Sequence, residues 1–294
     1  MEHLPAGPLT ETQVTAFWRD GYVLMDGAVS TGQLAALRGA VAGWVEESRD
    51  HDGPWGTTMD GRGRFDVQPG HSAERPALRR VASPQEVCDV HLRIMRDSAL
   101  VDAAAQLVGP NLVVNNVKTN CKQPGAGTAV RFHQDFAYEA HSNDDLLAAL
   151  LFVDDVTLDN GPLEVVPGSH KWGILGENDF RGRDLEAQIA RIEARSGRAF
   201  ATVCCQLEAG CVSFHNGATI HGSRANRSNS PRRSLVVHMI PDGTCFKGGT
   251  PADDNWYNLW IQAKDGDPYA GPYFPVIYRE NDALANPWAV ERDA

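Results

Sequence analysis

The sequence predicts a mainly β protein, in which strands form a sandwich or small barrel with flanking helices. Two observations carry this prediction. Before residue 110 apolar residues recur mainly at helical spacing, and after it they alternate with polar residues at the period of a strand. A charged helical segment at 175–200 interrupts the strands. We expect this segment to lie over the mouth of the barrel as a lid.

The part before residue 110 carries the signals of four helices, which we expect to support the strands as a buttress. These helices begin at Thr10, after Ser30, after Ser83 and at Asp97 or Ser98, and Gly109 with Pro110 ends the last one. For the third helix, Ser83 and Glu86 match a capping box, and Pro84 stands at the first helical position. A short strand is expected between the first two helices, at 21–27.

The later strands are predicted from alternating apolar residues bounded by turn residues. The strand-like runs are 112–122, 129–136, 146–153, 163–166, 211–215 and 233–240. The residues from 242 onward are rich in aromatic residues and proline, and we expect them to wrap around the body. The chain is therefore predicted to be a single domain over 1–294, with a helical buttress at 1–110, a strand core at 111–241 and a C-terminal wrap at 242–294.

The composition excludes several classes of function. The 294 residues carry 27 Lys and Arg against 38 Asp and Glu, a formal net charge of −11, so binding to nucleic acid or to an anionic membrane is not expected. The longest apolar run, 146–153, is too short for a membrane span, and the N-terminus lacks a signal-peptide pattern. Six cysteines without a CxxC pair are typical of reduced thiols. We expect a cytoplasmic protein and leave its oligomeric state open.

One candidate for metal chemistry stands in the second half of the chain. Among ten histidines, only His133 is followed two positions later by an aspartate, Asp135, in a strand-like run. Residues two apart on a strand share a face, so these side chains are expected to project together into the barrel. Alone, such a pair is more often an ordinary polar pair. The segment 210–233 adds His221 as a third ligand and arginines that could grip a carboxylate, and two histidines with one carboxylate can hold Fe(II) while leaving positions open.

Taken together, these motifs resemble the phytanoyl-CoA dioxygenase family of Fe(II)- and 2-oxoglutarate-dependent oxygenases. The resemblance covers most of the chain. It rests on Asp20-Gly21-Tyr22-Val23, His133-Gln134-Asp135, Asn160-Gly161-Pro162-Leu163, Pro167-Gly168-Ser169-His170, and His221-Gly222-Ser223 followed by Arg232 eleven residues after His221. The resemblance implies a double-stranded β-helix, which is a cupin-like jelly roll, supported by N-terminal helices.

The resemblance also implies roles for individual residues. His133, Asp135 and His221 are the expected metal ligands. Arg232 is the expected partner of the distal carboxylate of 2-oxoglutarate, with Ser223 as its hydrogen-bonding helper. Since relatives that chlorinate carbon have a small residue in place of the aspartate, the presence of Asp135 argues against halogenation.

Further positions around this site carry weaker expectations. Lys118 and Asn120 share one strand face and match positions where relatives contact 2-oxoglutarate or the substrate, and Arg80 matches a basic co-substrate contact. Leu151 stands where some relatives carry an aromatic residue against the co-substrate. Two more predictions concern neighbours of the site: Arg233 points away from Arg232 because of the two-residue period, and His215 forms part of the cavity wall.

The function implied by the resemblance is hydroxylation of an unactivated C–H bond of a small molecule, with release of succinate and CO2. The implied cofactors are Fe(II), 2-oxoglutarate as co-substrate and O2, and ascorbate is expected to support activity. The excess of Arg over Lys is typical of GC-rich bacterial genes, and on that association we expect a specialised metabolite as substrate. Two alternatives stay open. The same site could catalyse oxidative cyclisation, epimerisation or desaturation, or the chain could be a metal-binding barrel without 2-oxoglutarate chemistry.

Overall fold

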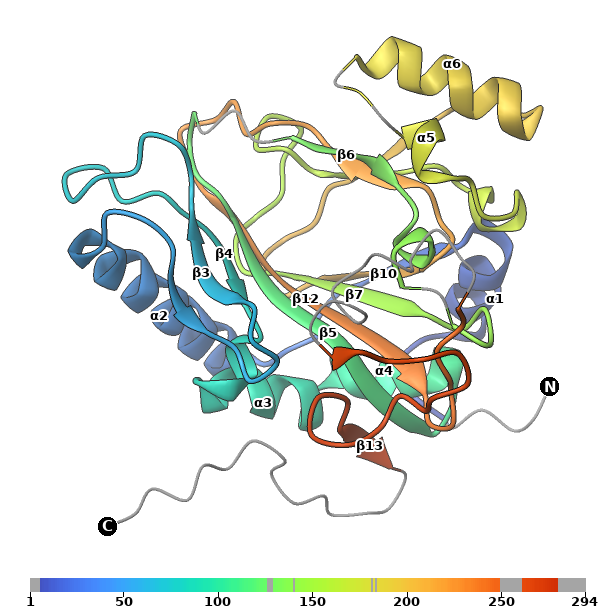
Figure 1. The fold of residues 1–294 in the computed structure, drawn as a ribbon, viewed down its shortest axis with the longest axis horizontal. Helices are drawn as coiled ribbons and strands as arrows, with labels where there is room; N and C mark the ends of the chain where they lie inside the picture. Colours follow the sequence, from blue (N-terminus) through green and yellow to red (C-terminus); the bar gives the residue numbers. More distant parts are fainter. Residues whose placement is uncertain are drawn as a thin grey trace.

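Two antiparallel sheets make up the centre of the computed structural model, which describes residues 6–125, 129–139, 141–180, 182, 184–248 and 261–279 (Figure 1). In spatial order, the larger sheet contains β1 (Tyr22–Met25), β10 (Val212–Asn216), β7 (Leu147–Phe152), β12 (Arg232–Pro241), β5 (Asn111–Lys122), β4 (Leu78–Ala82), β3 (Gly63–Val67) and β2 (Trp55–Thr57), and β13 (Val276–Arg279) also pairs with β5. The smaller sheet contains β6 (Val130–His133), β11 (His221–Ser223), β8 (Leu163–Val165) and β9 (Val203–Cys205).

The strand order confirms the expected double-stranded β-helix. From β5 to β12 the chain passes back and forth between the sheets, so that β5, β7, β10 and β12 fall in the larger sheet and β6, β8, β9 and β11 in the smaller. The two sheets face each other without closing into a continuous barrel. Strands distant in sequence therefore become neighbours, and β11 pairs with β6 through His221 and His133.

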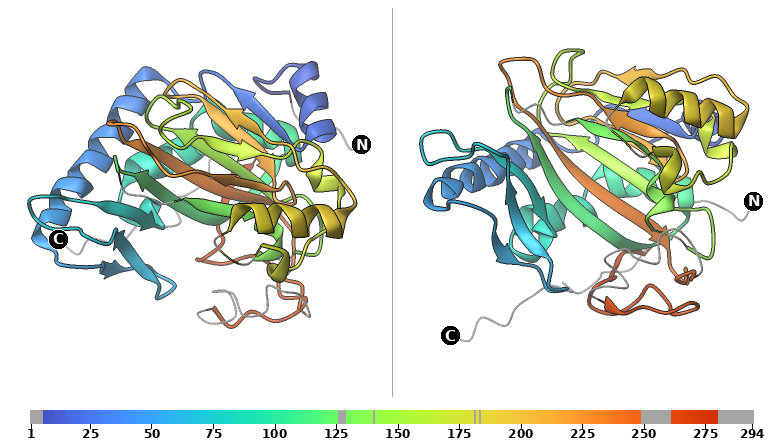
Figure 2. Two further views of the ribbon diagram at one scale, coloured as in Figure 1. Left: turned by 90° about the horizontal axis from the view of Figure 1, so that it is seen from above. Right: turned by 45° about the horizontal axis from the view of Figure 1, so that its top comes forward.

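Helices cover the outer face of the larger sheet (Figure 2). They are α1 (Glu11–Asp20), α2 (Thr31–Glu47), α3 (Asp89–Arg96) and α4 (Ala99–Val108). Ser30 caps the second helix as expected, and Thr10, which was expected as the first helical residue, caps the first. Both form capping boxes, with Gln33 and Gln13. Their apolar faces bury Leu37 and other side chains against the sheet in the largest hydrophobic cluster.

The sequence of strand β7 is entirely apolar, and its position in the sheet explains this. All six residues, Leu147–Phe152, are buried, because both faces of this central strand are covered. Leu147, Ala149 and Leu151 pack into the cluster with the helices, whereas Leu150 and Phe152 point toward the smaller sheet. This alternation decides which side chains can reach the space between the sheets.

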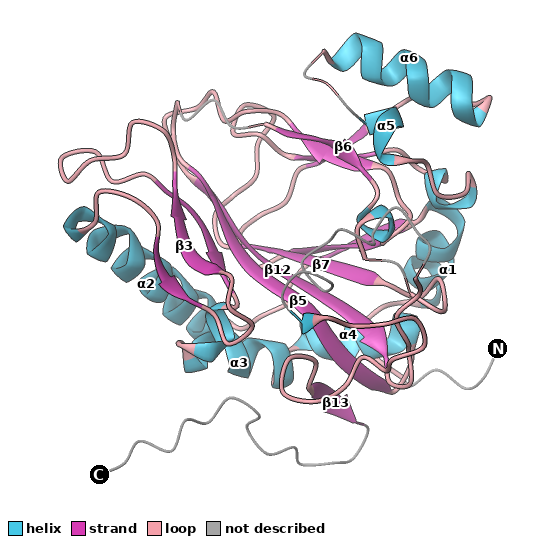
Figure 3. Ribbon diagram, in the orientation of Figure 1, coloured by secondary structure: helices cyan, strands magenta, loops and turns pink. Residues whose placement is uncertain are grey.

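The strand expected at 21–27 is confirmed as β1, but the prediction of helices for the rest of the chain before residue 110 was incomplete. Residues 55–82 contain β2, β3 and β4, which extend the larger sheet beyond β5 beside α2 (Figure 3). The capping box at Ser83 was wrong as well. Ser83 has a left-handed backbone with φ of 46°, and its N–H donates to the Val117 carbonyl on β5, so only a short 3-10 turn, Pro84–Glu86, follows it. Helix α3 begins later, after Cys88.

The segment predicted as a lid forms α5 (Glu177–Phe180) and α6 (Leu185–Ser196), beside the smaller sheet. Phe180 and Ile192 pack in a cluster with Phe132 of β6, and Gln188 donates to the Phe132 carbonyl. Of the expected C-terminal wrap, Tyr269 and Phe274 are buried against Phe246, while Trp256, Tyr257, Trp260 and Trp288 lie outside the described residues.

Candidate metal centre

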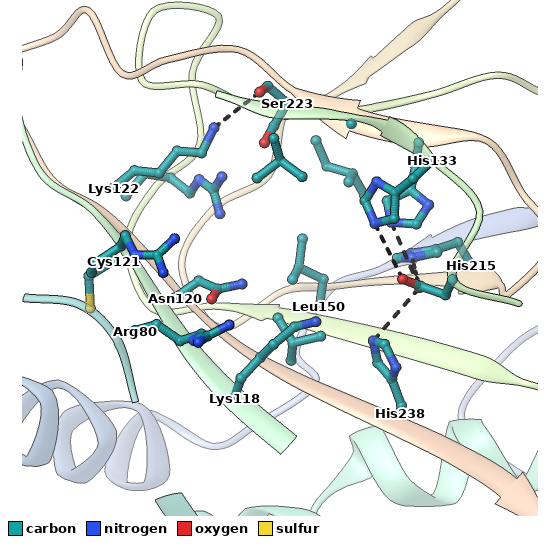
Figure 4. Close-up of a pocket in the computed structure, with 18 of the residues that line it drawn as sticks. Arg80, Lys118, Asn120, Cys121, Lys122, His133, Leu150, His215, Ser223 and His238 are labelled. Atoms are coloured by element: carbon teal, nitrogen blue, oxygen red, sulfur yellow. Dashed lines mark hydrogen bonds and ion pairs between the residues drawn. The ribbon is translucent and has the colours of Figure 1, made fainter. Parts of the chain in front are cut away.

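Three side chains converge between the two sheets. His133 ends β6, His221 begins β11 directly opposite it, and Asp135 opens a short 3-10 turn, Asp135–Ala137. The possible ligand atoms of these three residues all lie within 4.8 Å of one another. Asp135 Oδ1 lies 3.4 Å from His133 Nε2, and Asp135 Oδ2 lies 3.7 Å from His221 Nε2 (Figure 4). The convergence matches the expectation, although Asp135 does not lie on a strand: the chain turns after His133, and a turn rather than strand alternation brings the carboxylate to the imidazole.

Backbone carbonyls fix the orientation of both imidazoles. His133 Nδ1 lies 2.8 Å from the Arg131 carbonyl oxygen, and His221 Nδ1 lies 2.9 Å from the Thr219 carbonyl oxygen. A carbonyl only accepts, so each Nδ1 carries a proton, and each Nε2 is turned toward Asp135, where it can serve as the ligand atom. Such an outer hydrogen bond on the distal ring nitrogen is the usual support of a metal-binding histidine.

The protonation states also suit a metal. Burial raises the pKa of the Asp135 carboxyl, but the charge of the nearby His238 and the interactions with the other surrounding histidines outweigh it, so this pKa lies well below its usual range. Burial and the neighbouring His133 hold the pKa of His221 well below its usual range. Metals bind ionised carboxylates and neutral imidazoles. Among the described residues Asp135 Oδ2 has no hydrogen-bond partner despite its burial, which is the expected state of an oxygen reserved for a ligand. The residues present therefore fit a divalent iron ion.

A further group of side chains surrounds Asp135, and sequence reasoning missed most of it. His238 Nε2 lies 3.7 Å from Asp135 Oδ2, and His238 Nδ1 lies 3.0 Å from Glu139 Oε2. Although burial lowers the pKa of His238, Glu139 and Asp135 raise it above its ordinary value overall. His215 Nε2 lies 3.4 Å from Asp135 Oδ2, in the wall of the site as predicted. His238 could have been found, because it follows Arg232 by six residues and therefore shares its strand face.

A cavity of about 240 Å³ opens beside this cluster (Figure 4). The predicted residues that line it are His133, Asp135, His221, His215, Ser223, Arg232, Lys118, Asn120 and Arg80. The Leu151 expectation was wrong, because strand alternation turns Leu151 into the core with the helices and places its neighbour Leu150 in the cavity wall.

Arg232 is the buried cation at one end of the cavity. Its Nε donates to the Gly161 carbonyl at 3.2 Å and its Nη1 to Ser234 Oγ at 3.1 Å. Burial lowers the pKa of Arg232 to about 10, so it stays charged at neutral pH. Arg233 turns to the opposite face and pairs with Asp154 at 2.7 Å, as the two-residue period predicts.

Lys122 stands beside Arg232, directly across from it in the pairing of β5 with β12, and was not singled out from the sequence. Its Nζ donates to the carbonyls of Ser223, at 3.3 Å, and Arg224. Burial, and then the charge of Arg232, lower the pKa of Lys122 to about 6. This end of the cavity therefore combines a fixed positive charge with an amine that is largely neutral at neutral pH.

A second cavity of about 470 Å³ meets the first at the histidine cluster. Both are lined by Lys118, Val130, His133 and Asp135, and the second is also lined by Asn116, Arg131, Phe132, Tyr138, Glu139 and Phe180. The two compartments thus share His133 and Asp135, two of the three converging side chains. Among the described residues, none of the helices combines the length and the apolar character that crossing a bilayer requires.

Comparison with known proteins identifies a family. The model of the family described as phytanoyl-CoA dioxygenase matches residues 17–234. The chain is 31% identical to an L-proline trans-4-hydroxylase of Streptomyces griseoviridis over 250 residues, which are 79% of this chain and 86% of that protein. It is also 31% identical to a probable alpha-ketoglutarate-dependent hypophosphite dioxygenase of Stutzerimonas stutzeri, over 54% of this chain and only 56% of that protein.

Solved structures share the fold. EctD from S. alaskensis, crystallised with 2-oxoglutarate and 5-hydroxyectoine, superposes with a TM-score of 0.69 at 22% identity, over 91% of this chain and 88% of that one. The alpha-ketoglutarate-dependent carbocyclase SnoK from nogalamycin biosynthesis gives a TM-score of 0.67 at 22% identity, over 92% of this chain and 96% of that one.

Proposed function

The chain belongs to the phytanoyl-CoA dioxygenase family, and from this premise we propose that it hydroxylates an unactivated C–H bond of a small molecule. The proposed reaction consumes 2-oxoglutarate and O2 and releases succinate and CO2, with ascorbate supporting repeated turnover. A specialised metabolite is the proposed substrate, and the cytoplasm the proposed location. The observation that carries the proposal is one cavity lined both by the cluster of His133, Asp135 and His221 and by the buried Arg232.

In this proposal His133, Asp135 and His221 hold Fe(II), which when bound supplies the means of activating O2. The two histidines are ready to bind because the Arg131 and Thr219 carbonyls keep the proton on Nδ1. His238 and His215 flank Asp135 and stabilise its ionised form. These residues set ligand geometry and charge, which is the contribution that a protein makes to cofactor chemistry.

Arg232 is proposed to grip the distal carboxylate of 2-oxoglutarate, with Ser223 as a second hydrogen-bonding group. Its guanidinium is held in place by Gly161 and Ser234 and offers further N–H donors to the cavity. Asn120, two residues from Lys122 on the same strand face, is proposed to contact the co-substrate as well. Lys118 lines both cavities and is proposed to lie between co-substrate and substrate.

The test is succinate formation by the purified chain with Fe(II), ascorbate and 2-oxoglutarate in air, with and without a panel of small-molecule candidates. We expect 2-oxoglutarate to bind the metal-loaded protein and one or more candidates to raise succinate formation. No binding of 2-oxoglutarate, together with no succinate under any condition, would leave the alternative of a metal-binding barrel. Product masses separate the remaining outcomes, because hydroxylation adds an oxygen atom, desaturation and cyclisation remove two hydrogens, and epimerisation leaves the mass unchanged.

A further inference from the structure

The second cavity, of about 470 Å³, exposes one tyrosine ring beside the metal cluster. This cavity is lined by His133 and Asp135, and among its described lining residues are three phenyl or phenol rings, those of Phe132, Tyr138 and Phe180. Phe132 and Phe180 are only 6% and 2% exposed, and they pack together in one hydrophobic cluster. Tyr138 is 38% exposed. Of these three rings, that of Tyr138 is therefore the one most open to a reagent in the cavity.

The turn that positions Asp135 also positions Tyr138. Tyr138 directly follows the 3-10 turn Asp135–Ala137, and its backbone N–H donates to the Asp135 carbonyl at 2.9 Å. The centre of its ring lies 6.1 Å from the centre of the His133 ring, with 65° between the two planes. One short segment therefore carries two of the expected metal ligands and holds a phenol ring next to them.

The chemistry of the ring makes this position consequential. The hydroxyl of a phenol donates electron density to its ring, so an electrophilic oxidant attacks tyrosine in preference to phenylalanine. Arg232 lies in the other cavity, so the proposed co-substrate occupies that cavity and leaves the second one for the substrate. While no substrate fills the second cavity, nothing in its described lining separates the Tyr138 ring from the space beside His133 and Asp135.

We propose that Tyr138 is a modification site, which is hydroxylated to a catechol when 2-oxoglutarate and O2 react while the second cavity holds no substrate. This inference rests on the proposed function, which supplies both reactants. A ring C–H bond beside the phenol hydroxyl becomes C–OH, while the bond between the keto carbon and the adjacent carboxylate carbon of 2-oxoglutarate breaks and CO2 leaves. One atom of O2 enters the ring and the other enters succinate. The ring and 2-oxoglutarate each lose two electrons, and O2 gains the four.

The experiment incubates the full chain with Fe(II), ascorbate, 2-oxoglutarate and isotopically heavy O2, without substrate and with catalase to remove free peroxide. Mass spectrometry of the digested protein then locates the added oxygen. We expect the peptide that contains Tyr138 to gain the mass of one heavy oxygen atom, at that residue. Tyr273 is an internal control, since it is 40% exposed but lines neither cavity, and it should stay unmodified. Omitting 2-oxoglutarate controls for free-radical chemistry of iron with ascorbate.

Matched variants and a measurement without turnover complete the test. Tyr138→Phe removes the activating hydroxyl and should lower oxygen incorporation at position 138, whereas Tyr273→Phe should leave the labelling of Tyr138 unchanged. Asp135→Ala should abolish the labelling. In protein labelled with fluorotyrosine, the fluorine resonance that disappears in Tyr138→Phe should be broadened by paramagnetic Mn(II) but not by Zn(II), because broadening reports closeness to the bound metal. The resonance that disappears in Tyr273→Phe should be broadened less.

Several outcomes would overturn the proposal. They are equal labelling of Tyr138 and Tyr273, labelling that does not need 2-oxoglutarate, and a Tyr138 resonance broadened no more than that of Tyr273. Succinate formation with no oxygen on Tyr138, or with oxygen on another residue of the cavity, would overturn it and leave the proposed function intact. If 2-oxoglutarate neither bound the Mn(II)-loaded protein nor gave succinate with Fe(II), the proposed function would fail, and this proposal with it.

Discussion

Replacing Arg232 with alanine tests the proposed co-substrate grip most directly. Arg232 is 4% exposed and charged at neutral pH, and its neighbours Gly161 and Ser234 use only part of its donors. Two charge-assisted hydrogen bonds to a carboxylate are worth about 3 kcal/mol or more together, because the carboxylate would otherwise be buried without a partner. We therefore expect Arg232→Ala to raise the Kd for 2-oxoglutarate by roughly a hundredfold or more.

The assay is calorimetric titration of the Mn(II)-loaded protein with 2-oxoglutarate, in parallel with the thermal unfolding midpoint of each variant. Arg233→Ala is the matched control, since Arg233 follows directly in the chain and pairs with Asp154 on the other face. It should keep its affinity for 2-oxoglutarate even if it loses stability. The assignment would be refuted if Arg232→Ala bound 2-oxoglutarate normally while Arg233→Ala bound it weakly.

Three further predictions concern the metal, the turn at Gly161 and the buried lysine. His133→Ala and Asp135→Ala should each abolish stoichiometric Fe(II) binding in equilibrium dialysis, while the far-ultraviolet circular dichroism spectrum stays native. If both variants retained one tightly bound iron, the triad of His133, Asp135 and His221 would be excluded as the metal site. Gly161→Ala should lower the free energy of unfolding by about 1–3 kcal/mol in urea, because Gly161 has a φ of 79° and an added Cβ would meet the Arg224 carbonyl at 2.5 Å; an unchanged midpoint would contradict this. Lys122 has a pKa of about 6 in the folded protein, against an ordinary value of 10.5. Between pH 6 and pH 9 the unfolded chain therefore binds one more proton than the folded protein, and the free energy of unfolding should rise with pH over this range. Lys122→Met should reduce that rise by up to about 1.4 kcal/mol per pH unit, and identical slopes in the two proteins would show that the amine stays charged when folded.

Much of the fold could be predicted because its signals are local. Capping boxes at Thr10 and Ser30 satisfy the first N–H groups of their own helices, so they act wherever those helices end up. The apolar run of β7 likewise follows from burial on both faces. Ser83 failed as a cap because a tertiary hydrogen bond to Val117 draws it into the pairing of β4 with β5. Strands β2 to β4 were missed because they are only three to five residues long, which leaves little alternation to detect.

Part of the candidate site could likewise be predicted from the sequence, and part could not. The motifs and the family resemblance that they carry suggested that His133, Asp135, His221 and Arg232 belong together. The two-residue period correctly separated Arg232 from Arg233. The expectation for Leu151 came from the resemblance and fails, and alternation alone could not correct it, because it does not say which of the two faces of β7 looks into the cavity. Only the packing of helices on one side and the smaller sheet on the other decides that.

The sequence by itself determined the residue types, their spacing and the alternation of each strand, since these depend on bonds and contacts between near neighbours in the chain. The tertiary structure alone decided which strands lie next to one another. It brought His238 of β12 against Asp135, Glu139 against His238, and Arg80 of β4 alongside Asn120 of β5. Such groupings depend on long-range strand pairing and on the burial of two apolar faces at once, and no short segment of the chain encodes them.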